Sequence, residues 1–331
     1  MDDNVSIEIQ LSSKQYAYEP GEKISGHVIL GLQDTVKIKR LDLNFVGEAT
    51  TNWDLRGGSG PIRVIKGKHE FVNEFIPLYA EEELEIGPGK RAFAFSVVIP
   101  EQGLSTLSIS GAVVKYSLMA LLKRPWKFDL KTQIPIRVHN HKSTPKEMLV
   151  VEKKPQTFRC GPISIQASLK KAIFTKGEFV SVPVNINNQG KRVVQGITAK
   201  IIQTVTCSGE VAGESEPRSK LITQPIASSV TGAKIVPGSK KAVELRLKIP
   251  DCLHTSSSCP ILQIGYSVVC DMEIVGWQKR RAFALPIVIG QPEEKPEEKM
   301  KEEEEEEEKN EEETEEKEDI EDIEEYDVDE E

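Results

Sequence analysis

Apolar and polar residues alternate along most of this chain. Four stretches show it clearly: Ile24, Val28 and Leu30; Leu41, Leu43 and Phe45; Phe93, Phe95, Val97 and Ile99; and Val243, Leu245, Leu247 and Ile249. Successive side chains of a β-strand point to opposite faces, so a period of two predicts strands with one buried face. Turn sequences separate these stretches, and convincing helical stripes are missing. We therefore predict an all-β protein built from antiparallel β-sandwiches.

One strand opening occurs twice. YEPGEKISGHVIL begins at Tyr18, and FTKGEFVSVPVNI begins at Phe174 with the same spacing. The likeness starts earlier, because the segment from Ile7 aligns without a gap to the segment from Ile163. Each half also closes on a similar strand, QIPIRV in the first and ALPIVIG in the second. We infer that one sandwich has been used twice in tandem.

Two matched turns open the repeated strands. Gly21 and Gly177 are predicted to take a positive φ, which glycine adopts without steric cost. Glu22 and Glu178 are expected to lie just inside the strand that follows each turn. We interpret the roles of these glycines and glutamates as structural in the first place.

Two further matched pairs lie near the end of each half. Pro100 aligns with Pro250, and Tyr116 aligns with Tyr266. A proline has no amide donor, so each is expected to end the pairing of an edge strand. Each tyrosine is expected to bury its ring while its hydroxyl finds a hydrogen-bond partner.

Composition divides the chain into four parts. We predict an N-terminal sandwich over residues 1–140, a polar interdomain connector over 141–157 and a C-terminal sandwich over 158–290. Residues 291–331 are a Glu-rich tail with almost nothing apolar to bury, which predicts disorder.

The net charge of −10 conceals an opposition between body and tail. Residues 291–331 carry 26 acidic residues and 5 lysines, whereas residues 1–290 carry 27 acidic and 38 basic residues. The body is therefore basic, and the acidic tail is expected to compete with anionic partners for the body's surface. The alternative is a tail that only increases solubility.

Basic clusters are the only candidate ligand-binding chemistry. Such groups suit phosphate oxygens of phosphorylated segments or acidic lipids, although alternate strand positions that simply face water give the same pattern. The candidate contacts for an anionic partner are Lys37, Lys39, Arg40, Lys123, Arg124 and Lys127. Two other groups are Lys240 with Lys241, and Lys279 with Arg280 and Arg281. Low aromatic content and the absence of a recognition motif speak against nucleic acid.

No catalytic, cofactor-binding or metal-binding residue is predicted. Hydrolase, kinase, zinc-protease and dinucleotide motifs are absent. The five cysteines are expected to be reduced thiols, and their spacing does not suit zinc. His139 and His141 are interpreted as polar linker residues rather than a metal pair. With no signal sequence or long apolar run, we expect a soluble intracellular protein.

A family resemblance becomes visible once these motifs are set in order. PGEKISGHV, RAFAFSVVIP, GAVVKYSLMALLKRPW, CPILQIGYSV and LPIVIG follow one another as in the alpha-arrestins, the arrestin domain-containing proteins. The resemblance covers roughly residues 5–290. The residues that carry it are Gly21, Glu22, Pro100, Tyr116, Arg124, Pro125, Trp126, Gly177, Glu178, Pro250, Cys259, Pro260 and Tyr266.

The resemblance implies a non-catalytic adaptor. Alpha-arrestins bind cytoplasmic regions of receptors and transporters, and recruit HECT-type ubiquitin ligases through PPxY motifs to promote endocytosis and sorting. No PPxY occurs here, which leaves three alternatives: ligase recruitment is lost, is handled by a partner arrestin, or is replaced by contacts of the acidic tail. The expected location is the cytoplasm, with peripheral association at the plasma membrane or endosomes.

Two other functions stay open. One is a soluble signalling or redox regulator resembling thioredoxin-interacting protein, a branch of the family that uses a cysteine in its second domain. The comparable stretch here, SVTGAKIVPG, has Ala233 and Lys234 instead of that cysteine. The other is a scaffold subunit of a sorting coat.

Overall fold

The computed structural model describes residues 4–13, 15, 17–55, 62–80, 84–141, 156–160, 162–211, 216–232, 234–276 and 280–291. Residues 1–291 form one compact unit, which contains all of the strands. The described residues contain no helix long and apolar enough to cross a membrane.

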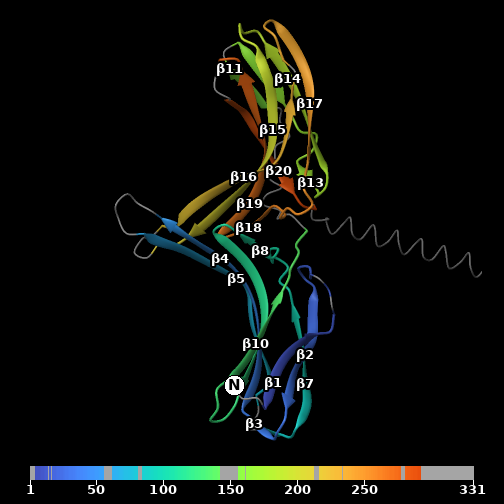
Figure 1. The fold of residues 1–331 in the computed structure, drawn as a ribbon, viewed down its shortest axis with the longest axis vertical. Helices are drawn as coiled ribbons and strands as arrows, with labels where there is room; N and C mark the ends of the chain where they lie inside the picture. The colour runs from blue at the N-terminus through green and yellow to red at the C-terminus, as the bar shows by residue number, and fades with distance from the viewer. Residues whose placement is uncertain are drawn as a thin grey trace, which may run out of the picture. The chain divides into compact units, whose positions relative to one another are not determined.

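Within the described residues, ten strands build the first sandwich (Figure 1). They are β1 (Val5–Leu11), β2 (Lys23–Leu32), β3 (Val36–Ile38), β4 (Arg40–Leu55), β5 (Arg63–Tyr79), β6 (Leu84–Ile86), β7 (Gly89–Val98), β8 (Leu107–Ile109), β9 (Ala112–Lys123) and β10 (Leu130–Ile136). One sheet has the order β1-β2-β7 and the other β10-β9-β4-β5, with β8 beside β9. β3 and β6 pair separately.

The second sandwich repeats this plan. Its strands are β11 (Gln156–Cys160), β12 (Ile163–Ala167), β13 (Ile173–Phe174), β14 (Phe179–Asn188), β15 (Val194–Gly209), β16 (Arg218–Thr231), β17 (Ser239–Lys248), β18 (Ser257–Cys259), β19 (Leu262–Ile274) and β20 (Arg280–Ile289). One sheet has the order β11-β12-β14-β17 and the other β13-β20-β19-β15-β16, with β18 beside β19. The predicted all-β architecture of two tandem sandwiches is confirmed.

The cores lie between the two sheets of each sandwich, on the faces that the alternation predicts. In β2, Ile24, Val28 and Leu30 are fully buried, while Ser25 and His27 are exposed and Ile29 lies at intermediate depth. Phe93 and Val243 are only partly buried against the core. Each fully buried Leu or Ile contributes about 1.5–3 kcal/mol relative to exposure, so this alternation supplies the main stabilisation.

The two predicted turns have the same geometry. Gly21 and Gly177 have φ angles of 83° and 80°, which confirms the prediction of positive φ. Glu22 accepts a hydrogen bond from the amide of Glu19 at 2.9 Å, and Glu178 accepts one from the amide of Thr175 at 3.0 Å. The two glutamates lie one residue before β2 and β14 rather than inside them, because their carboxylates close the turns.

The matched tyrosines also have the same role. Tyr116 donates a hydrogen bond to the carbonyl oxygen of Leu104 at 2.9 Å, and Tyr266 donates one to that of His254 at 2.7 Å. In both cases the acceptor lies 12 residues earlier in the chain. Gln203 further donates to the Tyr266 hydroxyl, and burial raises the pKa of Tyr266 to about 12. Both tyrosines are buried and hydrogen-bonded, as predicted.

The matched prolines follow strand ends. β7 ends two residues before Pro100, and β17 ends two residues before Pro250. The carbonyl oxygen of Pro100 accepts a hydrogen bond from Gly103 at 2.9 Å, which turns the chain. The expectation that each proline ends strand pairing is confirmed.

Each sandwich also contains one short parallel contact, which the expectation of antiparallel sheets did not include. Tyr18 pairs with Val138 in the first, and β13 pairs with β20 in the second. In both sandwiches, the segment before the glycine turn lies beside the last strand or the residues that directly follow it. The parallel contact is therefore part of the repeated plan.

The boundaries between the parts remain predictions. β11 begins at Gln156, so the last two residues of the predicted connector 141–157 pair with β12. In the sheet, Gln156 lies opposite Ala167 and Thr157 lies opposite Gln166. Residues 56–61, 142–155 and 292–331 lie outside the described residues.

Glu178→Gln is expected to remove an acid-sensitive part of the stability of the second sandwich. Burial alone would raise the pKa of Glu178, but Lys171 and Thr175 together outweigh it and hold this pKa below its usual 4.5. A carboxyl whose pKa is lowered on folding stabilises the fold above its unfolded pKa, and this contribution is lost as pH falls through the lower folded pKa. Urea unfolding between neutral pH and about pH 3 should show the two proteins converging at low pH. A difference that stays constant across this range would contradict the assignment.

Candidate functional site

The candidate basic residues converge at one end of the first sandwich. Arg40 at the start of β4 lies opposite Lys123 at the end of β9, and the amide of Lys39 donates to the carbonyl oxygen of Lys123 at 2.9 Å. The sheet therefore joins the 37–40 cluster to the 123–127 cluster. This end is opposite the one where Thr51 of β4 lies beside Ala112.

The six candidates differ in what their side chains do. Arg124 is buried, and its guanidinium donates to the carbonyl oxygen of Phe128 at 2.8 Å, so it shapes the loop rather than facing a partner. Arg40 donates to Asp42 at 2.6 Å and lies over the ring of Phe75.

Four lysines of the set are exposed. Lys37 lies 3.7 Å from Glu85, and Lys39, Lys123 and Lys127 face outward. These three are the residues of the predicted site best placed for an anionic partner. The anion-binding role itself stays a prediction.

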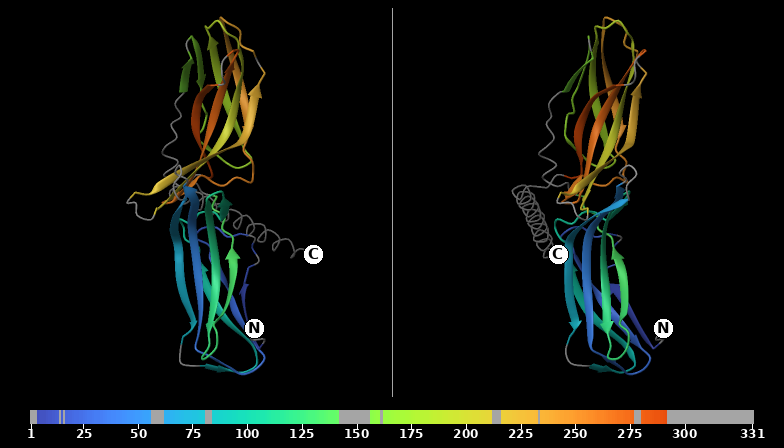
Figure 2. Two further views of the ribbon diagram at one scale, coloured as in Figure 1. Left: turned by 60° about the vertical axis from the view of Figure 1, so that its left-hand side comes forward. Right: turned by 90° about the vertical axis from the view of Figure 1, so that its left-hand side faces the viewer.

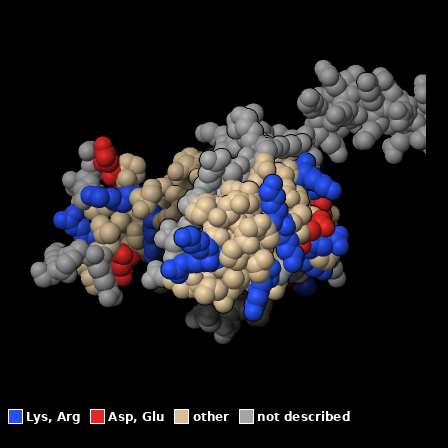
Figure 3. All heavy atoms as spheres, turned by 90° about the horizontal axis from the view of Figure 1, so that it is seen from above, with Lys and Arg blue, Asp and Glu red and all other residues tan. Residues whose placement is uncertain are grey.

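The other basic clusters do not add to this end. Lys240 and Lys241 are exposed at the start of β17 in the second sandwich. The side chains of the group from Lys279 to Arg281 lie outside the described residues. Figure 3 shows Lys and Arg side chains spread over the face that it draws, with few acidic side chains among them. Positive charge is thus dispersed over the body as well as collected at the β3–β4–β9 end.

The two sandwiches are joined by a backbone bridge. The amide of Glu210 donates to the carbonyl oxygen of Lys66 at 2.9 Å, and the amide of Lys66 donates back to that of Glu210 at 3.3 Å. Beside this bridge, Thr51 Oγ1 donates to the carbonyl oxygen of Ser208 at 2.7 Å. Ser208 is held in turn, because its amide donates to the carbonyl oxygen of Ile261 in the CPI motif at 2.7 Å.

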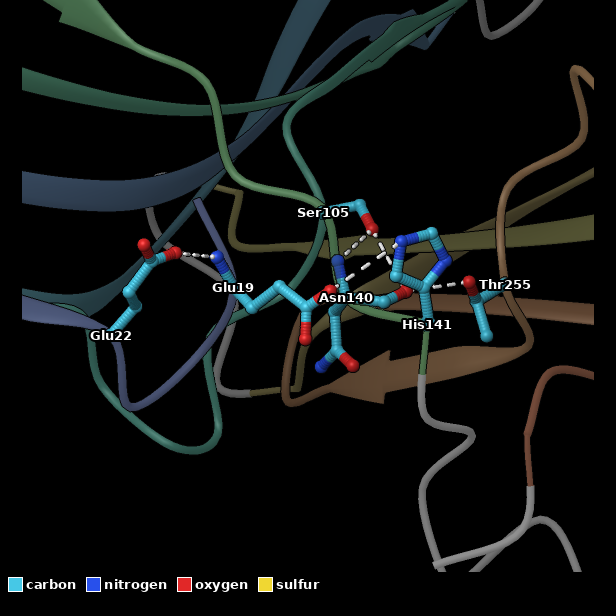
Figure 4. Close-up of polar contacts among 6 residues, drawn as sticks. All are labelled: Glu19, Glu22, Ser105, Asn140, His141 and Thr255. Carbon is cyan, nitrogen blue, oxygen red and sulfur yellow. Dashed lines mark hydrogen bonds and ion pairs between the residues drawn. The ribbon is translucent and has the colours of Figure 1, made fainter. Parts of the chain in front are cut away.

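A second contact between the sandwiches is polar and centres on Asn140 (Figure 4). Thr255 Oγ1 donates to the carbonyl oxygen of Asn140 at 2.7 Å. Ser105 Oγ donates to the same oxygen at 3.2 Å and accepts from the Asn140 amide at 2.9 Å. His141 Nε2 lies 3.9 Å from a carboxylate oxygen of Glu19. The end of the first sandwich is therefore bonded to the loop before β18.

The pKa values of three basic groups around this contact are lowered, which favours their uncharged forms. Burial, and then the neighbouring charge of Lys176, lowers the pKa of both His139 and His254. Burial also lowers the pKa of Lys176. The rings of His139 and His141 meet edge-on with centroids 6.0 Å apart. Within the described ranges, no group of three or more His, Cys, Asp or Glu side chains is arranged to hold a metal ion.

The cysteines whose side chains are described are free thiols. Burial raises the pKa of Cys207 and Cys259, and raises the pKa of Cys270 to about 12. A thiol of this kind is a poor nucleophile, because the thiolate is the reactive form. Cys252 is exposed.

Sequence reasoning missed the residues that join the sandwiches. Gly67 and Gly209 sit where the two backbones meet, and Thr51 and Thr255 supply the side-chain hydrogen bonds. An isolated glycine inside a strand pattern was the available signal, since it marks a close backbone approach. Thr51 and Thr255 gave no such signal, because a threonine is ordinary both in a strand, as at position 51, and in a polar loop, as at position 255.

Comparison with known proteins matches both halves of the chain. Residues 7–142 match the family model described as the arrestin (or S-antigen) N-terminal domain, and residues 159–294 match that of the C-terminal domain.

Three relatives match most of the chain. Human arrestin domain-containing protein 4 is 28% identical over 295 residues, which is 82% of this chain and 68% of the relative. Arrestin domain-containing protein 17 of Caenorhabditis elegans is 23% identical, over 86% of this chain and 70% of the relative. Human thioredoxin-interacting protein is 25% identical, over 86% and 74%.

Proposed function

Because this chain belongs to the arrestin family and resembles its alpha-arrestin branch, whose members are in general non-catalytic adaptors, we propose that it binds cytoplasmic regions of membrane receptors or transporters. The role would be in their endocytosis and sorting. The proposed location is the cytoplasm, with peripheral association at the plasma membrane or endosomes.

The observation that carries this proposal is the double connection between the sandwiches. The Lys66–Glu210 bridge and the hydrogen bonds on Asn140 bond the first sandwich to the second at two places. Because the two sandwiches are bonded to each other at two places, their outer surfaces can contact one partner together, as a scaffold requires.

The link to ubiquitination is indirect in this proposal. No PPxY motif occurs in the 331 residues, so we propose that a HECT-type ligase is reached through a second arrestin bound to this chain. The acidic residues of the tail at 291–331 would tune contacts of the basic body through long-range charge.

Proximity labelling in cells tests the adaptor function. The full chain, a chain without residues 291–331 and the junction variant Gly67→Ala would each be fused to the labelling enzyme. We expect enrichment of receptors or transporters by the full chain, stronger labelling of membrane proteins without the tail, and weaker labelling by the junction variant. Labelling confined to soluble proteins would overturn the proposal.

A second candidate is a soluble redox or signalling regulator, favoured by the relative named for its interaction with thioredoxin. The raised pKa values of the Cys207, Cys259 and Cys270 thiols weaken it, because they disfavour the thiolate form that disulfide exchange needs. Capture of thioredoxin by the wild-type chain, lost in a Cys252→Ser variant, would favour this candidate over the adaptor.

A further inference from the structure

The connection between β9 and β10 displays two aromatic side chains with almost no cover. Trp126 is 103% exposed and Phe128 is 93% exposed. Among the described residues, the next most exposed large apolar side chain is Val230, at 67%. Single exposed apolar residues are normal on protein surfaces, but two uncovered aromatic rings within three residues are not.

The loop is built to hold these rings outward. Trp126 has a φ of 55°, and among the described residues it is the one non-glycine residue with positive φ. A bulky residue keeps this conformation only where its surroundings enforce it. The buried guanidinium of Arg124 supplies that constraint, because it bonds the carbonyl oxygen of Phe128 across the turn. Below the loop, Leu122 of β9 pairs with Leu130 of β10.

Lysines surround the aromatic pair. Lys123 ends β9, Lys127 lies in the connection, and Lys39 is bonded to Lys123 through its backbone. Asp129 is the acidic residue within the connection itself. Both views in Figure 2 show the β9–β10 connection at the end of the first sandwich where β3 and β6 also lie. The connection therefore forms a tip with two exposed aromatic rings and exposed lysines beside them.

We propose that this tip, formed by Lys39, Lys123, Trp126, Lys127 and Phe128, is a contact site for the surface of an anionic lipid bilayer. Tryptophan and phenylalanine rings enter the headgroup region, where an aromatic ring is favoured over bulk water. Lysines at the same level are attracted to acidic headgroups. The partner is a lipid surface rather than a phosphopeptide, because the two most exposed apolar side chains of the described residues stand beside the lysines, and a phosphopeptide would use the lysines without the rings.

The expected contact is weak and reversible by itself. The two aromatic rings and three lysines together make one membrane contact. Stable attachment of a protein to a membrane needs two such contacts. The tip therefore orients the protein at a membrane where a second contact, such as a bound membrane protein, supplies the rest. Binding to pure lipid nevertheless tests the tip without any cargo.

Flotation of the full chain with vesicles tests the proposal. Vesicles of phosphatidylcholine alone would be compared with vesicles that also contain phosphatidylserine, at low salt. Trp126→Ser with Phe128→Ser should weaken partitioning roughly tenfold or more. Lys39→Gln with Lys123→Gln and Lys127→Gln should weaken it on the order of a hundredfold and remove the preference for phosphatidylserine.

Matched controls separate the tip from general effects. Val230→Ser on β16 removes another exposed apolar side chain and should bind like wild type. All variants should keep the thermal midpoint of wild type, because the changed side chains face water. In wild type, vesicles should also shift tryptophan emission to shorter wavelength, and this shift should disappear in the aromatic variant.

Two kinds of result would overturn the proposal, one from the flotation experiment and one from peptide binding. One is a wild-type chain that does not float with phosphatidylserine vesicles, or an aromatic variant that floats as well as wild type. The other is binding of a soluble phosphoserine peptide that depends on the three lysines and not on the two rings, which would assign the tip to phosphorylated segments instead.

Discussion

Gly67→Ala is expected to uncouple the unfolding of the two sandwiches. A Cβ at position 67 would lie 2.5 Å from both the carbonyl oxygen of Ser208 and Thr51 Oγ1, and one at Gly209 would lie 2.8 Å from the carbonyl carbon of Lys66. Since backbone atoms cannot move aside cheaply, the substitution must open the bridge between Lys66 and Glu210. The expected cost is about 1–3 kcal/mol for each glycine.

Scanning calorimetry measures this uncoupling. Wild type should unfold in one transition, whereas Gly67→Ala combined with Gly209→Ala should show two, one for each sandwich. Gly232→Ala is the matched control, because a Cβ there meets nothing within 4 Å. Glu210→Ala is a second control, since the bridge uses its amide and carbonyl groups rather than its side chain. Two transitions in wild type, or one in the double variant, would contradict the bridge as the coupling element.

Gly47→Ala is expected to cause a large loss of stability within the first sandwich. A Cβ there would overlap one ring carbon of Tyr116, and it would lie 2.5 Å from a second ring carbon and 2.9 Å from a methyl carbon of Val72. The ring cannot turn away without losing the hydrogen bond from its hydroxyl to Leu104, which lies in a buried position. Overpacking and loss of that bond together should cost about 2–4 kcal/mol.

Denaturant unfolding of the full chain would measure that cost. Gly265→Ala is the control, because this glycine lies in β19 and a Cβ added there would meet nothing within 4 Å. Alanine is better than glycine inside a strand, so the control should be neutral or slightly stabilising. A Gly47 variant as stable as wild type would show that the Tyr116 ring is less confined than the close contacts indicate.

The repeat was readable because its signals are local. The alternation of Ile24, Val28 and Leu30, and the turns at Gly21 and Gly177, depend on neighbours along the chain. The tyrosine roles were readable for the same reason, since each bonds a carbonyl group 12 residues away. Only the exact position of each glutamate differed, because a turn-closing carboxylate and a strand-opening residue have the same sequence pattern.

The candidate site was only partly readable. Sequence analysis named Lys39 and Lys123 but could not show that they are neighbours, since this depends on the register of β4 against β9. It counted Arg124 among the anion contacts, whereas the loop buries that side chain. It treated Trp126 as a family motif, because nothing in the sequence says which way the ring points.

By itself, the sequence determined that this protein is all-β, that one sandwich is used twice and that particular glycines and tyrosines hold each copy together. Only the tertiary structure decided that Lys66 and Glu210 join the copies, and that Trp126 stands among lysines brought from two distant segments. The physical reason is the distance along the chain between the residues that interact. Strand periodicity and turn geometry arise between residues close in the chain, whereas a bridge or a basic tip arises from the register of strands that the sequence keeps far apart.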